Sequence, residues 1–205
     1  MKEVNTILQH KQKIEHGGKE VRTLADELSR DSSIEESKKL AHTLFSHPEP
    51  AVKMVAVFLF GILAVQAEDA FAFLKEDVSK EPDWRVQEIL AQAFDRYCAD
   101  IAYERALPTI KAWLADERAN VRRAVSEGLR IWTTRAYFKD HPHVAVQLLS
   151  ALKDDESEYV RKSVGNALRD ISRKHKALVA EELETWDISD KKVLFTHKLA
   201  SKFLE

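Results

Sequence analysis

The sequence predicts an all-α protein, an α-solenoid of stacked helix pairs, and three observations support this fold class. The 205 residues include only 5 Gly and 5 Pro, too few for the many turns of a β-sandwich or barrel. Apolar residues recur with a helical period along most of the chain. A longer pattern then repeats roughly every 35 residues, which is typical of helical repeat proteins.

The repeat is anchored by five valines that each open an apolar helical pattern. They are separated by 34, 35, 39 and 33 residues, and they are Val52, Val86, Val121, Val160 and Val193. Further helical stretches lie between them, at residues 67–79, 103–115, 143–153 and 176–186. Two helices per period of this length indicate a HEAT-like solenoid, whose second helices commonly line the concave surface.

The remaining segments fit the same organisation. Residues 1–16, 19–30 and 34–46 are predicted helices, separated by Gly17-Gly18 and by the cap signal Asp31-Ser32-Ser33. The longer third step is assigned to residues 133–144, which we expect to form a loop. We expect a single domain over residues 1–205, with N-terminal helices in 1–46 and about five repeat units in 47–205.

The second helix of each repeat has two distinct faces when it is numbered from its valine. Positions 0, +4, +7, +8 and +11 are apolar, as in Val160, Val164 and Leu168, and are predicted to form the core. Positions +2, +6 and +9 form an opposite row, here called the polar stripe. Its members are Glu88, Gln92, Asp95, Arg123, Glu127, Arg130, Lys162, Asn166 and Arg169.

The polar stripe has two possible roles. It could be a solvated charged face, whose ion pairs contribute only about 0–1 kcal/mol each. It could instead bind DNA, with Arg123, Arg130, Lys162, Arg161 and Arg169 on phosphates. The carboxylates placed within the basic row favour a specific site, because a surface that binds only phosphates has no need of them.

Composition limits the alternatives. The net charge is −2, but residues 1–102 carry −5 and residues 103–205 carry +3, so a polyanion would favour the C-terminal half. The single cysteine excludes an internal disulfide or a multi-cysteine metal site. The sequence shows no transmembrane segment and no signal peptide, so a cytoplasmic protein without a membrane partner is expected.

Several conspicuous residues are better explained by structure than by chemistry. We interpret Cys98, Trp113 and Trp186 as packing residues. His141 and His143 flank a proline, and two histidines without a third ligand are a weak metal signal. No metal or cofactor is expected.

Four strings carry a resemblance to a known family: HPEPAVKMVAVFLFGILA, DWRVQEILAQAF, NVRRAVSEGLRIW and SEYVRKSVGNALRDISRKH. Together they resemble the HEAT-like repeat DNA glycosylases of the DNA alkylation repair family, over roughly residues 40–205. The resemblance implies excision of cationic N3- and N7-alkylpurines from duplex DNA without metal or cofactor. It also implies that the lesion is held in the duplex without full base flipping.

The resemblance further implies roles for individual residues. Trp84 and, four residues later, Glu88 match the family's aromatic residue and catalytic carboxylate, and Arg123 matches a residue that grips the DNA backbone. Glu127 and Asp170 match additional carboxylates of one branch. Arg130, Lys162, Arg169, Arg161 and Asn166 complete the expected DNA-binding set.

The sequence also departs from that pattern, which leaves two hypotheses. Asn166 stands where one branch has a tryptophan, and Glu88 is one methylene longer than that branch's aspartate. The leading hypothesis is a monomeric glycosylase that hydrolyses N-glycosidic bonds. The alternative is a catalytically silent HEAT-repeat scaffold that binds DNA weakly or binds a protein partner.

Overall fold

The structure, a computed structural model, describes residues 2–15 and 18–204 and is helical throughout, with no strand in those ranges. This confirms the predicted all-α class of helix pairs. The helices group into two compact units, residues 1–101 and 102–205. The boundary falls between two repeats, and the single-domain organisation stays a prediction. In the described part of the chain no helix has the length and apolar character needed to span a membrane.

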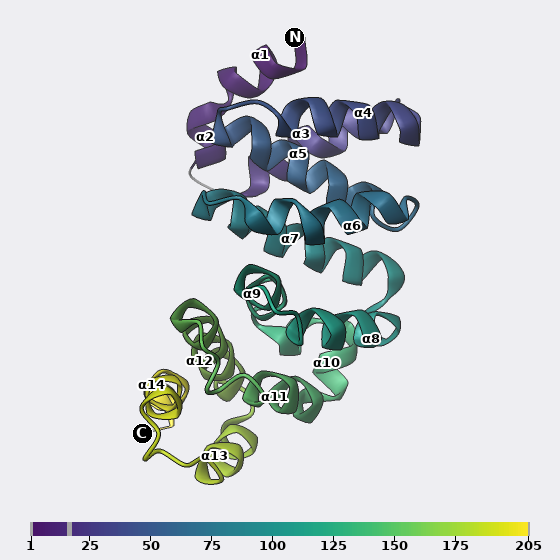
Figure 1. The fold of residues 1–205 in the computed structure, drawn as a ribbon. Helices are drawn as coiled ribbons and strands as arrows, with labels where there is room; N and C mark the ends of the chain where they lie inside the picture. The colour runs from purple at the N-terminus through teal and green to yellow at the C-terminus, as the bar shows by residue number, and fades with distance from the viewer. Residues whose placement is uncertain (1, 16–17, 205) are drawn as a thin grey trace. The chain divides into compact units, whose positions relative to one another are not determined.

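The first unit holds the N-terminal helices and the first two repeats (Figure 1). Its elements are α1 (Lys2–Gln9), α2 (Lys11–Glu15), α3 (Gly18–Arg30), α4 (Ile34–Phe45), α5 (Pro50–Leu63), α6 (Glu68–Glu76), the 3-10 turn η1 (Val78–Lys80) and α7 (Trp84–Ile101).

Helix α5 is the centre of this unit and packs against α3, α4, α6 and α7. It is apolar on nearly all sides, as expected of a helix with neighbours all round. Gly61 permits close contact with α7, since a Cβ there would lie 2.7 Å from the Cβ of Ala93. The predicted start of α4 is confirmed in detail, because Ser33 and Glu36 form a reciprocal capping box.

The second unit holds the later repeats. Its elements are α8 (Tyr103–Leu114), α9 (Ala119–Gly128), the 3-10 turn η2 (Trp132–Thr134), α10 (Ala136–Asp140), α11 (Pro142–Ser150), α12 (Glu158–Ser172), α13 (Lys176–Glu184), α14 (Lys191–Ala200) and the 3-10 turn η3 (Ser201–Phe203). Helix α12 is central here and packs against α9, α11, α13 and α14.

The predicted core is confirmed. All five repeat valines are at most 5% exposed, and they open α5, α7, α9, α12 and α14. Trp113, Trp186 and Cys98 are buried as interpreted. Burial also raises the pKa of the Cys98 thiol, with a smaller contribution from nearby Asp95, which leaves the thiol protonated and unreactive.

Two predictions of local structure are wrong. Residues 1–16 are not one helix, because the N–H of His10 turns back to the carbonyl of Ile7 at 3.0 Å and separates α1 from α2. The His10 ring then contacts the Glu20 carboxylate of α3, a tertiary contact that local propensity does not encode. His16 and Gly17 lie outside the described residues.

The segment 133–144 is not a loop. It contains the end of η2, all of α10 and the first residues of α11. Phe138 is fully buried, with its ring 4.9 Å from that of Trp132, and this packing holds the short helix α10. Pro142, which suggested a loop, occupies the first turn of α11, where its missing N–H is harmless.

Candidate DNA-facing site

Trp84 and Glu88 lie one turn apart at the start of α7 and line the same hollow of about 250 Å³. We call this hollow the α7 groove; its lining includes Glu15, Met54, Trp84, Arg85, Glu88 and Gln92. Trp84 is 69% exposed although it is a large apolar residue, whereas Glu88 is half-buried. The four-residue spacing therefore places an open indole face and a carboxylate side by side.

Trp84 is fixed by the residues on either side of it. The Arg85 guanidinium donates to both carboxylate oxygens of Asp83, at 3.0 and 2.7 Å, and the Arg85 N–H donates to Asp83 at 2.9 Å. Arg85 also lies 3.6 Å from a carboxylate oxygen of Glu15 in α2. Hydrogen bonding to Arg85 lowers the pKa of Asp83, so the Asp83 carboxylate is ionised at neutral pH. We call the hydrogen-bonded pair of Asp83 and Arg85 the Asp83–Arg85 clasp.

The N-terminal helices form part of the wall of the α7 groove. Arg22 of α3 donates to Gln92 Oε1 at 2.7 Å. Gly18, at the start of α3, lies so close that an added Cβ would be 2.3 Å from the same oxygen. Gln92 was predicted to belong to an open polar stripe, but in the structure its side chain is hydrogen-bonded to Arg22 of α3.

A second hollow, the α12 pocket, lies on α9 and α12 within the second unit. It measures about 200 Å³, and its lining includes Arg123, Glu127, Arg130, Tyr159, Lys162 and Asn166. Three cationic side chains and one carboxylate give it a net positive charge. The prediction that these polar-stripe residues share one surface is therefore confirmed within this unit.

Glu127 and Asp170 are bound into a charge network beside the α12 pocket. Arg130 donates to Glu127 at 3.1 Å and to Asp170 at 3.0 Å. Arg169 donates to the other oxygen of Asp170 at 3.3 Å, and Ser163 donates to Glu127 at 2.8 Å. Burial would lower the pKa of Arg130, but the hydrogen bond to Asp170 and the attraction of Glu127 outweigh it, so the guanidinium stays charged.

Arg161 does not belong to the exposed basic surface. It follows the repeat valine at position +1, is 9% exposed, and donates to backbone carbonyls of Asp155 and Glu156. Gln87 and Arg122, the equivalent +1 residues, make the same kind of bond. In all three repeats an acceptor is the carbonyl six residues earlier, that of Glu81, Asp116 or Asp155. The side chain at position +1 therefore holds the loop before each helix by a hydrogen bond to its backbone. The prediction that Arg161 contacts DNA is corrected, because this side chain is buried and bonded to the protein backbone.

Tyr159 is the residue that the sequence analysis missed. It is 72% exposed and lines the α12 pocket. The signal was available, because position −1 lies on the same helical face as +2 and +6.

Arg169 faces the Phe203 ring at 5.6 Å. Trp84 and Glu88 belong to the first unit and Arg123 to the second, and the roles assigned to these three residues stay predictions.

The two histidines, His141 and His143, lie at the start of α11. His141 stacks on Tyr137 with ring centroids 4.5 Å apart, and its Nδ1 hydrogen-bonds the Tyr137 carbonyl oxygen at 3.0 Å. Within residues 2–15 and 18–204, no group of three or more His, Cys, Asp or Glu could hold a metal ion.

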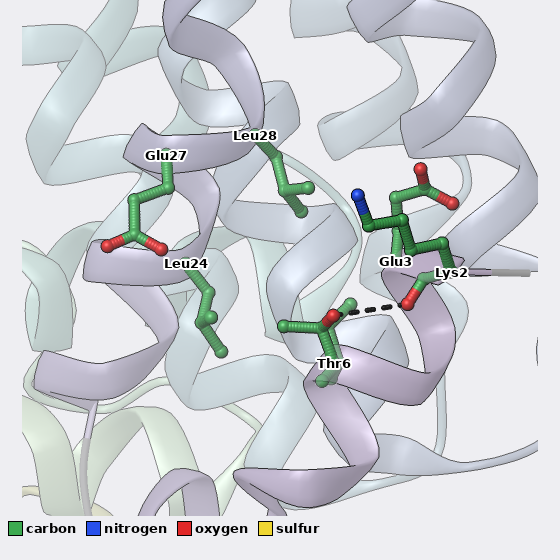
Figure 2. A pocket seen from close by; sticks show the side chains of 7 residues that line it. Lys2, Glu3, Thr6, Leu24, Glu27 and Leu28 are labelled. Carbon is green, nitrogen blue, oxygen red and sulfur yellow. Dashed lines mark hydrogen bonds between the residues drawn. The ribbon is translucent and has the colours of Figure 1, made fainter.

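One further hollow lies between α1 and α3, and none of the predicted site residues lines it. Figure 2 shows Lys2, Glu3 and Thr6 on one side of it and Leu24, Glu27 and Leu28 on the other. Its hydrogen bond, from the Thr6 hydroxyl to the Lys2 carbonyl at 3.1 Å, lies within α1. Its charged lining residues, Lys2, Glu3 and Glu27, have no role in the predicted site.

Comparison with known proteins agrees with this fold. AlkD2 from Streptococcus mutans, solved by crystallography, is 44% identical, with 99% of each chain covered and a TM-score of 0.93. The Pseudomonas fluorescens alkylpurine DNA glycosylase AlkC, bound to DNA containing an abasic site analog, shares the fold at 24% identity. Its TM-score is 0.67, with 84% of this chain and 48% of that one covered.

A curated Bacillus subtilis protein, the uncharacterized protein YhaZ, is 37% identical over 87 residues, which are 40% of this chain and 24% of that protein. The chain thus matches about a quarter of YhaZ. A family model described as DNA alkylation repair enzyme matches residues 17–199. With nearly the whole chain matched, the protein belongs to the DNA alkylation repair enzyme family.

Proposed function

We propose that this protein is a DNA glycosylase that hydrolyses the N-glycosidic bond of cationic N3- and N7-alkylpurines in duplex DNA. The observation that carries the proposal is the pairing of Trp84 and Glu88 in the α7 groove. An exposed indole attracts a cation through its π face, and an alkylated purine is cationic. Membership of the DNA alkylation repair enzyme family supports this assignment.

The chemistry needs only groups that the α7 groove supplies. When the C1′–N bond breaks, its electron pair neutralises the cationic base, and positive charge develops on the deoxyribose. The Glu88 carboxylate stabilises that charge and orients a water molecule toward C1′. The water oxygen then bonds to C1′ and its proton passes to Glu88 or to solvent. Because the leaving base is already cationic, no general acid is required.

Phosphate contacts are assigned to the second unit. Lys162 is exposed beside Arg123 on the α12 pocket, and Arg130 and Arg169 lie on the same polar stripe. Arg130 and Arg169 both bond to Asp170. Lys162 is the leading phosphate ligand because its side chain is exposed, and Arg123 is assigned a second phosphate contact because it lines the same pocket. Asn166 lines the same pocket, which supports assigning it a hydrogen bond to DNA.

The test is release of free base from duplex DNA that carries either 7-methylguanine or a neutral lesion. The proposal requires release of the cationic base in preference to the neutral one, and Trp84→Ala must reduce that preference. No release of either base would remove the enzymatic function.

A second candidate function is a catalytically silent scaffold that binds DNA or a protein through the same surfaces. It is favoured by one specific observation: Arg130 forms ion pairs with both Glu127 and Asp170, so these additional carboxylates have a structural role. A DNA titration at two salt concentrations separates its two forms. Phosphate binding requires affinity to fall steeply with salt, whereas a protein-binding scaffold shows no DNA affinity to titrate.

A further inference from the structure

Tyr159 is the most exposed large apolar or aromatic side chain in the described part of the chain, at 72%. Single exposed aromatic residues are common and need no explanation by themselves. Tyr159 differs because it lines the α12 pocket from the first turn of α12. Among the described residues, the only comparably exposed aromatic side chain is Trp84, at 69%, and it too lies on the first turn of a second helix and lines a hollow.

The chemistry around Tyr159 suits one nucleotide. Lys162 and Arg123 supply positive charge, and the Asn166 amide supplies both a donor and an acceptor. Lys162 lies three residues after Tyr159 and Asn166 seven after, so all three project from one face of α12. The volume of about 200 Å³ is below that of ordinary small-molecule sites, which suits a single base or sugar phosphate.

We propose that the α12 pocket binds one unpaired nucleotide of DNA, with its base stacked on the Tyr159 ring. Lys162 and Arg123 bind the adjacent phosphates, and the Asn166 amide hydrogen-bonds the edge of the base. This inference rests on the proposed DNA-binding function but does not involve the chemistry of Glu88.

The base must be unpaired for a simple geometric reason. Inside a duplex both faces of each base are covered by neighbouring base pairs, so an external ring has no face to stack on. An unstacked base offers its π face, and aromatic side chains beside basic residues are the usual platforms for such bases. A fully paired duplex contacts the same pocket only through its phosphates.

The experiment compares three fluorescently labelled DNAs by anisotropy: a single strand, its fully paired duplex, and the same duplex with one bulged nucleotide. Tyr159→Ala is expected to weaken binding of the single strand and the bulged duplex by about tenfold, as for loss of one stacked base. It should change binding of the paired duplex by less than about twofold, since phosphate contacts remain. Tyr159→Phe, which keeps the ring, should bind all three like the wild type.

Ile188→Ala is the matched control, because Ile188 is 50% exposed and lies between α13 and α14, outside the pocket lining. Equal weakening of all three DNAs by Tyr159→Ala would overturn the inference, and so would no weakening of any. In both cases binding of the paired duplex by the wild type would leave the proposed function standing. If the wild type binds none of the three DNAs, both proposals fail.

Discussion

The guanidinium of Arg85 holds the carboxylate of Asp83 through two hydrogen bonds, of 3.0 and 2.7 Å, across the residue that separates them. That residue is Trp84, the exposed indole of the α7 groove. The clasp fixes the backbone at the first turn of α7, so the indole is positioned without burying it. An exposed functional aromatic residue needs support of this kind, because core packing cannot supply it.

Asp83→Asn should destabilise the protein in a pH-dependent way. The pKa of Asp83 is lowered in the folded state, so its contribution is complete above the usual aspartate pKa and is lost as pH falls through the lowered value. The free energy of unfolding of Asp83→Asn should therefore lie below that of the wild type at pH 7 by a constant gap. Urea titrations should show this gap closing below about pH 4. A gap that widens in acid would refute the clasp.

Asp155→Ala should cost about 3 kcal/mol of folding stability, because it leaves the largely buried Arg122 guanidinium without its carboxylate partner. Arg122 donates to both Asp155 oxygens, at 2.6 and 2.8 Å, and this side chain of Asp155 is only 4% exposed. Lys192→Ala is the matched control, because it breaks the ion pair of Lys192 with Glu156, whose side chain is 87% exposed. This exposed pair should contribute less than about 1 kcal/mol to folding stability. Equal losses in denaturant titrations would contradict the distinction.

Ile131→Gly should stabilise the protein by about 1 kcal/mol. Ile131 has φ 54°, a left-handed conformation that is costly for a β-branched residue and free for glycine. It is 46% exposed, so little burial is lost. Ile188→Gly is the control: it removes an equally exposed isoleucine from a turn without positive φ, and it should destabilise slightly. Thermal unfolding in which both variants lose stability would contradict the account of strain at Ile131.

Two neighbouring cationic residues of α12, Arg161 and Lys162, should have different roles: Lys162 contacts DNA, and Arg161 stabilises the fold. Lys162→Ala should reduce the slope of log affinity for duplex DNA against log salt by about 1, as expected for one phosphate contact. Arg161→Ala should leave that slope unchanged and lower stability by about 2 kcal/mol, because it strands buried backbone carbonyls. A reduced slope for Arg161→Ala would return that residue to the DNA surface.

Periodicity was sufficient to predict the helix pairs and the core. Val52, Val86 and Val160 mark buried positions because a helix must bury one stripe, and that requirement is local in sequence. The break at His10 and the helix α10 were missed, because each depends on a side-chain contact between two separate elements: His10 with Glu20 of α3, and Phe138 of α10 with Trp132 of η2.

The candidate site was only partly predictable, for a related reason. Spacing correctly placed Trp84 with Glu88, and Lys162 with Asn166, since each pair shares one helix. Spacing could not show that Arg161 donates to a backbone carbonyl or that Arg22 donates to the Gln92 amide oxygen. In both cases the partner lies outside the helix of the donor. The sequence therefore predicts which face of a helix a functional side chain occupies, but it does not predict the hydrogen-bond partner of that side chain.

The most direct test of the account is base release from duplex DNA containing 7-methylguanine by the wild type and by Glu88→Gln, measured under single-turnover conditions. The substitution keeps the shape of the side chain and removes its charge. The account predicts release by the wild type and a rate at least about 100-fold lower for Glu88→Gln, the size of effect typical of losing one charge-stabilising group. Equal rates for the two proteins, or no release by the wild type, would contradict it.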